Sequence, residues 1–226
     1  MKTDLFLRKS AVVVLASAAF LILSACKFDL ATDVYLSDII DLPHAGEPVF
    51  APAVISFSNP SDDKKQQIID LLDTYFLSVE NVRVENADSS DTMMADIKIP
   101  LVMSTDDRAS AETPFELVVD AKADRYDVCL RLNKAVWERL NAGISGIISQ
   151  SLSLREAGLT FTVINDQKKS ETLEFSSVYA DDKPIPYAEK TEIERKESVE
   201  VRLSNVLQGT LDGDGVNRIR IVSLMK

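Results

Sequence analysis

The stretch formed by Leu23, Ser24, Ala25 and Cys26 is the part of the chain whose residue types most clearly indicate a chemical reaction. Three basic residues near the amino terminus precede an uninterrupted run of small or apolar residues at 11–23, which leads into the small pair of serine and alanine. This order is typical of an export signal that a peptidase cleaves after small residues. The apolar run is too short to cross a bilayer, which takes about 20 apolar residues. We therefore predict cleavage of residues 1–25.

The same four residues resemble the lipobox of bacterial lipoproteins, in which an apolar run, a small pair and a cysteine coincide. The resemblance implies that the lipoprotein signal peptidase recognises Leu23, Ser24 and Ala25, and that the Cys26 thiol receives a diacylglyceryl group. Acylation of the new amino terminus would add a further chain such as palmitate. The resemblance covers only residues 1–26, and it leaves open the alternative of a plain signal peptide with a cysteine after it.

Lipidation of Cys26 would place the chain at a membrane, because each buried acyl CH₂ contributes about 0.8 kcal/mol and several chains together hold firmly. In enterobacterial lipoproteins an aspartate after the cysteine causes retention in the inner membrane, and here that position is Lys27. For a Gram-negative host, the resemblance thus implies the inner leaflet of the outer membrane, facing the periplasm. It also implies two partners, the membrane and the lipoprotein processing and sorting machinery. The hypothesis of a binding module, given below, adds an unidentified envelope protein or ligand.

The charge of the chain argues against nucleic acid as a partner. The full chain has 25 basic and 36 acidic residues and a net charge of −11; without residues 1–25 these become 22 and 35, a net charge of −13. Proteins that grip a phosphate backbone do so largely with Lys and Arg, so an acidic chain is poorly suited to it. An acidic surface is typical of an exported protein that must stay soluble.

Cys129 has no partner in the chain once Cys26 carries lipid, so no intramolecular disulfide is expected. Its neighbours Val128 and Leu130 indicate a strand. We expect the Cys129 side chain to be a small buried apolar group, with a reactive or intermolecular thiol as the alternative.

Other candidate sites fail on the spacing of their residues. The acids of the loop at 212–215 could suggest calcium, but an EF-hand alignment puts Thr210 first and Ile221 twelfth, where oxygen ligands are required. The single histidine, His44, excludes histidine-rich zinc sites and is expected in an exposed loop. Adjacent acids occur at 62–63, 106–107 and 181–182, as expected for solvated loops and caps in so acidic a chain. We therefore predict no catalytic residue, no metal and no cofactor.

Hydrophobic periodicity predicts an α+β fold, a mainly antiparallel sheet of hairpins with two packed amphipathic helices. Strand patterns begin at Phe28 and recur to the carboxyl terminus, and two segments have the three- and four-residue spacing of helices, one after Ser61 and one after Asn133. A short helix is also expected at 188–196. Two hairpins are expected, and they join 115–119 to 126–130 and 159–163 to 173–177.

The length predicts a cleaved signal at 1–25 and a single periplasmic domain at 26–226, with a possible internal boundary in the charged segment 181–198. The hypothesis that fits best is a lipid-anchored periplasmic lipoprotein, a non-enzymatic binding or scaffolding module at the cell envelope. One alternative is an exclusion or immunity lipoprotein encoded by a phage or plasmid. Another is an envelope hydrolase that works through carboxylates.

Overall fold

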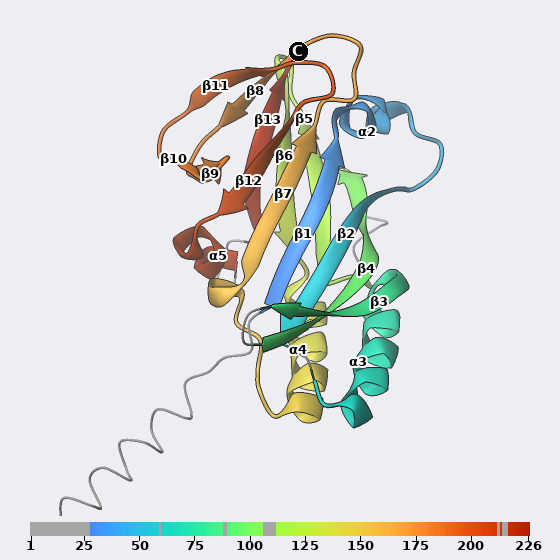
Figure 1. Cartoon of the computed structure of the whole chain (residues 1–226). Coiled ribbons are helices and arrows are strands. Elements are labelled where there is room, and N and C mark those ends of the chain that lie inside the picture. Colours follow the sequence, from blue (N-terminus) through green and yellow to red (C-terminus); the bar gives the residue numbers. More distant parts are fainter. Residues whose placement is uncertain (1–27, 59, 88–89, 106–111, 212, 214–216) are drawn as a thin grey trace, which may run out of the picture.

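Strand β1 (Phe28–Tyr35) runs through the middle of a large sheet (Figure 1). The computed structural model describes residues 28–58, 60–87, 90–105, 112–211, 213 and 217–226. Alternate residues of β1 are buried, as the sequence pattern predicts. The strand pairs antiparallel with β2 (Val49–Ser58) on one side and parallel with β7 (Gly158–Ile164) on the other. A strand at the very start of the described chain is thus a central strand of the sheet.

The sheet has thirteen strands in the described part of the chain. Besides β1, β2 and β7, these are β3 (Leu77–Ala87), β4 (Ser90–Met103), β5 (Phe115–Ala121), β6 (Arg125–Leu132), β8 (Glu171–Phe175), β9 (Val178–Ala180), β10 (Lys183–Ile185), β11 (Glu189–Ile193), β12 (Ser198–Leu203) and β13 (Arg218–Met225). Twelve of them follow the order β10-β9-β12-β7-β1-β2-β4-β5-β6-β13-β8-β11, and β3 pairs with β4 beside this path.

The strands at the two ends of this order, β10 and β11, are neighbours in the chain and lie close together in Figure 1. The sheet therefore curls into a nearly closed, barrel-like wall, and the fold is mainly β. The predicted α+β fold, with helices packed on a sheet of hairpins, is wrong. Two pairings are parallel, β1 with β7, which are far apart in the sequence, and β4 with β5, which follow one another in the chain. A hairpin joins antiparallel strands, so hairpins alone do not build this sheet.

The predicted hairpin of β5 and β6 is confirmed, with Phe115 opposite Leu132 and Ala121 opposite Tyr126. The predicted pairing of 159–163 with 173–177 is wrong, because β7 pairs with β1 and β12 while β8 pairs with β11 and β13. The expected helix at 188–196 is also wrong, since residues 189–193 form β11 against β8. Alternation of apolar residues identifies which side chains of a strand face the core, but it does not identify the strand with which that strand pairs.

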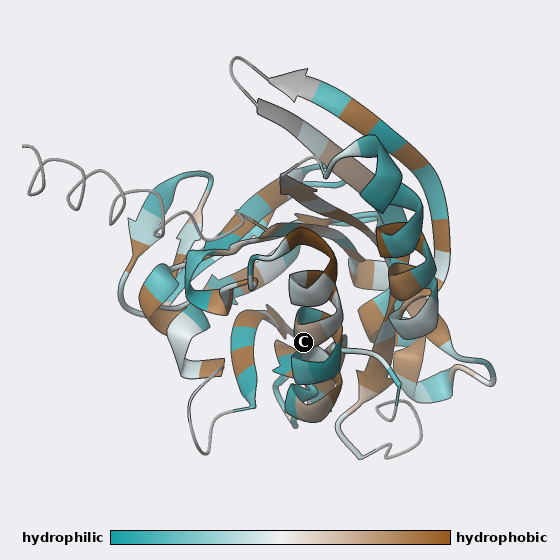
Figure 2. Cartoon of the chain, turned by 90° about the horizontal axis from the view of Figure 1, so that it is seen from below, coloured by the Kyte–Doolittle hydropathy of each residue, from teal (hydrophilic) through white to brown (hydrophobic). Residues whose placement is uncertain are grey.

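The helices lie outside the wall of strands. Their bounds are α2 (Leu36–Asp41), α3 (Asp62–Tyr75), α4 (Lys134–Ile148) and α5 (Asn205–Leu211), with short 3₁₀ helices η1 (Leu42–His44) and η2 (Leu154–Glu156). The two predicted amphipathic helices are α3 and α4, and Asn133 caps α4 by accepting a hydrogen bond from the Val136 N–H at 3.3 Å. Both helices lie at one end of the sheet, and in the view from below α4 lies across that end (Figure 2).

The two helices pack closely at Gly143, where an added Cβ would lie 2.8 Å from a methyl carbon of Leu71. Glycine at 143 therefore permits this close approach. At Gly146 the chain is not close-packed, because nothing lies within 4 Å of the position that its Cβ would take.

Three aromatic side chains join β1, β5 and α4 at this end of the molecule. The ring centroids of Phe28 and Phe115 are 6.0 Å apart, and the Trp137 ring lies 5.5 Å from Phe28 and 5.4 Å from Phe115. All three side chains are at most 3% exposed and belong to one continuous core. Trp137 therefore serves packing, and the cluster holds α4 against the end of the sheet.

Replacing Trp137 with alanine should lower the free energy of unfolding by about 3–5 kcal/mol, because it removes a buried aromatic ring and leaves a cavity. Urea unfolding followed by far-ultraviolet circular dichroism would measure the change. Tyr187, which is 82% exposed, supplies the control, and its replacement by alanine should change the stability by less than about 0.5 kcal/mol. Equal losses in the two variants would contradict this account of the core.

Candidate functional site

The proposed lipidation residue and its recognition sequence, Leu23 to Cys26, lie outside the described residues. The same holds for most of the acidic loop at 212–215, of which only Gly213 is described. No helix in the described ranges is long and apolar enough to cross a membrane. What the structure adds is the position of β1, whose first residue, Phe28, comes two residues after Cys26.

The other residues considered from the sequence do not gather at one place. His44 is exposed, as predicted, at the end of η1. The adjacent acids at 62–63 and 181–182 are exposed at the start of α3 and in a turn, and the pair at 106–107 lies outside the described residues. Cys129 is buried in β6 at 6% exposure, which confirms the prediction, and burial raises the pKa of its thiol to about 11.

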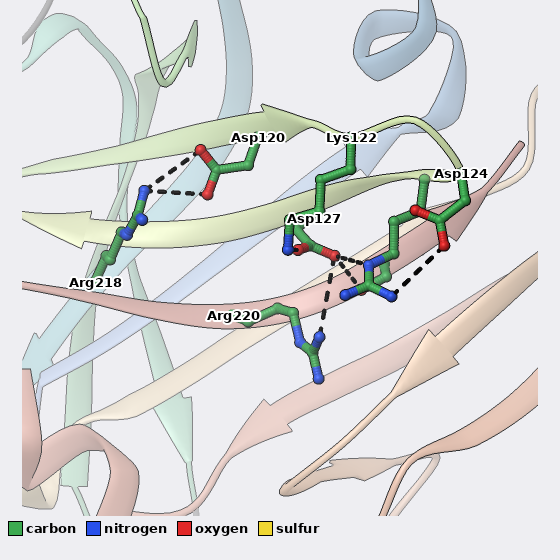
Figure 3. A network of polar contacts seen from close by, with 8 residues as sticks. Asp120, Lys122, Asp124, Asp127, Arg218 and Arg220 are labelled. Carbon is green, nitrogen blue, oxygen red and sulfur yellow. Dashed lines mark hydrogen bonds and ion pairs between the residues drawn. The ribbon is translucent and has the colours of Figure 1, made fainter.

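A network of ion pairs covers Cys129 on the outer face of β5, β6 and β13 (Figure 3). Asp127 is 4% exposed and accepts hydrogen bonds from Lys122, from Arg125 at 2.9 Å and from the Ser223 hydroxyl at 2.6 Å. Arg218 of β13 pairs with Asp120 of β5 at 3.1 Å, across the strand β6 that lies between them. These charges satisfy one another, so the network serves to cover and join three strands.

The best-formed hollow, here called the acidic groove, has a volume of about 650 Å³. It lies between the loop that enters β2, the end of α3, the end of β4 and the two residues 112–113 shortly before β5. Its lining residues are Leu42, Ala45, Gly46, Glu47, Pro48, Val49, Phe50, Asp73, Thr74, Tyr75, Phe76, Leu77, Pro100, Leu101, Val102, Met103, Glu112 and Thr113. The size is within the usual range of ligand sites.

The pairing of strands along β4 explains where the groove opens. On one side of β4, β3 pairs as far as Lys98 and β5 joins at Leu101. Pro100 lies between these two pairings and has no N–H to donate. Along its other edge β4 pairs with β2, where Pro100 is opposite Phe50. Both residues line the groove, so its floor is apolar.

The polar groups of the groove are acids and one buried hydroxyl. Glu47, Asp73 and Glu112 line it, and no lysine, arginine or histidine is among the described residues that do. Thr113 is 5% exposed, and its Oγ1 has no hydrogen-bond partner within the described part of the chain. A buried hydroxyl is normally paired, so this atom is a group that a ligand could satisfy.

A second hollow of about 450 Å³ lies where β3 crosses the outer face of β1 and β2 (Figure 1). Two of its charges are paired: Arg83 donates to Asp96 at 2.8 Å, and the Asn81 amide donates to the same carboxylate at 2.9 Å. These hydrogen bonds, with burial opposing them, hold the pKa of Asp96 below its usual range. The acidic groove, with its unpaired Thr113 hydroxyl, is therefore the better candidate.

No sequence pattern indicates this groove, because its walls come from four segments, 42–50, 73–77, 100–103 and 112–113. None of them carries a local motif. The unusual features, a proline inside β4 and acids beside apolar residues, acquire meaning only when the segments are brought together.

Comparison with known proteins gives a family but no activity. Residues 28–223 match the family described as "Domain of unknown function (DUF7424)". No curated protein and no solved structure matches the chain.

Replacing Asp127 with asparagine should destabilise the protein by about 1–3 kcal/mol at neutral pH, because Lys122 and Arg125 would then face a neutral amide in place of a buried carboxylate. Burial raises the pKa of Asp127, but hydrogen bonds from Lys122 and Ser223 and nearby positive charge outweigh it, and the net pKa is lowered. A lowered pKa means that the contribution is present above the usual carboxyl value of 3.8 and is lost as the pH falls through the folded-state pKa. Unfolding at several pH values would measure it.

The matched control for this experiment is Asp124→Asn, because the Asp124 side chain is 67% exposed and lies 3.9 Å from Arg125. Its effect should be small at every pH. A loss in Asp127→Asn that persists unchanged below the folded-state pKa would show that the charge of Asp127 is not what stabilises the network.

Proposed function

The chain belongs to the DUF7424 family, and we propose that it is a lipid-anchored module that faces the periplasm and binds another component of the cell envelope. The observation that carries the binding role is the acidic groove, an apolar hollow in which the Thr113 hydroxyl is buried without a partner. The anchoring role rests on the resemblance of Leu23 to Cys26 to a lipobox.

The position of β1 supports a body held close to the membrane. If Cys26 becomes the first residue, only Lys27 separates the lipid from Phe28, the first residue of a central strand. Two residues of extended chain reach about 7 Å. The end of the sheet that carries Phe28, α3 and α4 would then lie next to the bilayer (Figure 1).

One wall of the acidic groove lies far from Phe28. Phe57 of β2 is opposite Phe28, and the groove is lined by Phe50, seven residues away along the same strand. At about 3.3 Å per residue the separation is roughly 23 Å. The other walls include the end of α3 and Thr113, two residues before Phe115, so the groove extends from that part of β2 toward the end that carries the two helices.

The anchor makes a direct prediction about the mature amino terminus. Mass spectrometry of protein purified from its native membrane should show Cys26 as the first residue, carrying a diacylglyceryl group and an added acyl chain. Cys26→Ala should lose the lipid and the firm attachment to membranes, whereas the control Cys129→Ala should keep both. An unmodified Cys26, or a chain that retains residues 1–25, would refute the anchor.

A side chain that fills the acidic groove should block the partner. Gly46 lines the groove and nothing lies within 4 Å of its missing Cβ, so Gly46→Trp can be made without a backbone clash. Gly146 has equally open space but lies on α4, outside the groove, so Gly146→Trp is the matched control. After cross-linking in native membranes, partners captured by the wild type should be lost at least tenfold in Gly46→Trp and kept in Gly146→Trp. Identical capture by the two variants would refute binding in the groove.

A further inference from the structure

We propose that the occupant of the acidic groove is a segment of a partner protein in which apolar side chains alternate with lysine or arginine. This inference rests on the proposed binding function and names the chemistry of its ligand. Three features of the groove carry it: the apolar floor, the acids along its sides and the unpaired hydroxyl of Thr113.

The floor calls for apolar side chains. Phe50 and Val49 are only partly buried, although they lie on a strand of the main sheet, and Leu77 is 48% exposed where α3 gives way to β3. These residues belong to the lining, together with Pro100 and Met103. Covering such a surface removes apolar area from water at roughly 25 cal/mol per Å², which is the main favourable contribution available here.

The acids call for positive charge on the same ligand. Glu47, Asp73 and Glu112 come from three separate segments, and no cation among the described lining residues pairs with them. Asp96 in the second hollow differs, since it is already bonded to Arg83 and Asn81. Exposed charge pairs contribute little affinity each, but complementary charge selects partners and speeds association.

The hydroxyl of Thr113 favours a polypeptide. Its Oγ1 can donate one hydrogen bond and accept others, and a peptide backbone offers both a carbonyl and an N–H. A plain alkyl chain would leave the hydroxyl unpaired and buried, which is unfavourable.

The test measures binding of a short labelled peptide of alternating leucine and lysine by its fluorescence anisotropy. The full mature protein is held in lipid nanodiscs, and empty nanodiscs give the background. A second peptide has glutamate in place of lysine, and a third has serine in place of leucine. We expect binding of the leucine–lysine peptide, weakened at least tenfold by either replacement and by higher salt. Equal binding of the leucine–glutamate peptide would overturn the proposal.

Charge reversal within the groove gives the second arm. The triple variant Glu47→Lys, Asp73→Lys and Glu112→Lys should weaken the leucine–lysine peptide at least tenfold. A control with the same change in net charge reverses three exposed acids outside the groove, Glu138→Lys, Glu156→Lys and Glu189→Lys, and should bind within about threefold of the wild type. Equal weakening in both sets would show that only overall charge matters, and would overturn the assignment to the groove.

The two levels of the proposal fail in different ways. If native partners are lost in Gly46→Trp but are captured normally by the triple groove variant, the groove binds a partner and the cationic character of its ligand is wrong. If Gly46→Trp and Gly146→Trp capture the same partners, the binding function of the groove is wrong, and the inference about its ligand falls with it.

Discussion

The contact of Phe28 with Phe115 and Trp137 is the interaction on which the architecture depends most directly. It joins the first described strand, a strand near the middle of the chain and the helix that lies across one end of the sheet. Without this contact, α4 would not cover that end of the sheet, and the apolar residues inside the wall of strands would be exposed to water there. Because Phe28 is so near Cys26, the same contact also fixes the body relative to the residue proposed to carry lipid.

Polar groups are treated differently in two parts of the molecule. On the outer face of β5, β6 and β13, the carboxylate of Asp127 is bonded by three neighbours, and the buried Glu116 pairs with Arg131 at 2.7 Å. In the acidic groove, Thr113 is buried without a partner and the acids face no cation from the lining. Buried atoms without a hydrogen-bond partner occur in both parts, since Glu116 Oε2 and Arg131 Nη2 also have none within the described chain. The contrast therefore lies in the charges: the acids of the outer face pair with cations, and those that line the groove do not.

Local features of the fold were predictable from sequence, and long-range pairing was not. The alternation of Phe28, Leu30 and Val34 correctly identified a strand with one buried face, and the turn between β5 and β6 correctly identified a hairpin. Alternation says nothing about which strand lies next to which. The predicted hairpin therefore pairs β7 with β8, whereas in the structure β7 pairs with β1 and β8 pairs with β13. The groove depends on that long-range pairing, since Phe50 and Pro100 meet only when β2 and β4 do.

The parallel pairing of β1 with β7 is fixed at both ends by side chains: the Asp29 carboxylate accepts from the Gly158 N–H at 2.9 Å, and Asp166 accepts from the Ser37 N–H at 2.9 Å. A Cβ at position 158 would lie 2.2 Å from Asp29 Oδ1, so a larger residue there would displace the carboxylate that accepts this hydrogen bond. Both contacts join residues 129 positions apart. Closing so long a loop is slow, and β1 has an open edge until β7 arrives. Strand β1 would be among the last strands to gain both neighbours, and its open edge is a site for pairing with another chain during that interval.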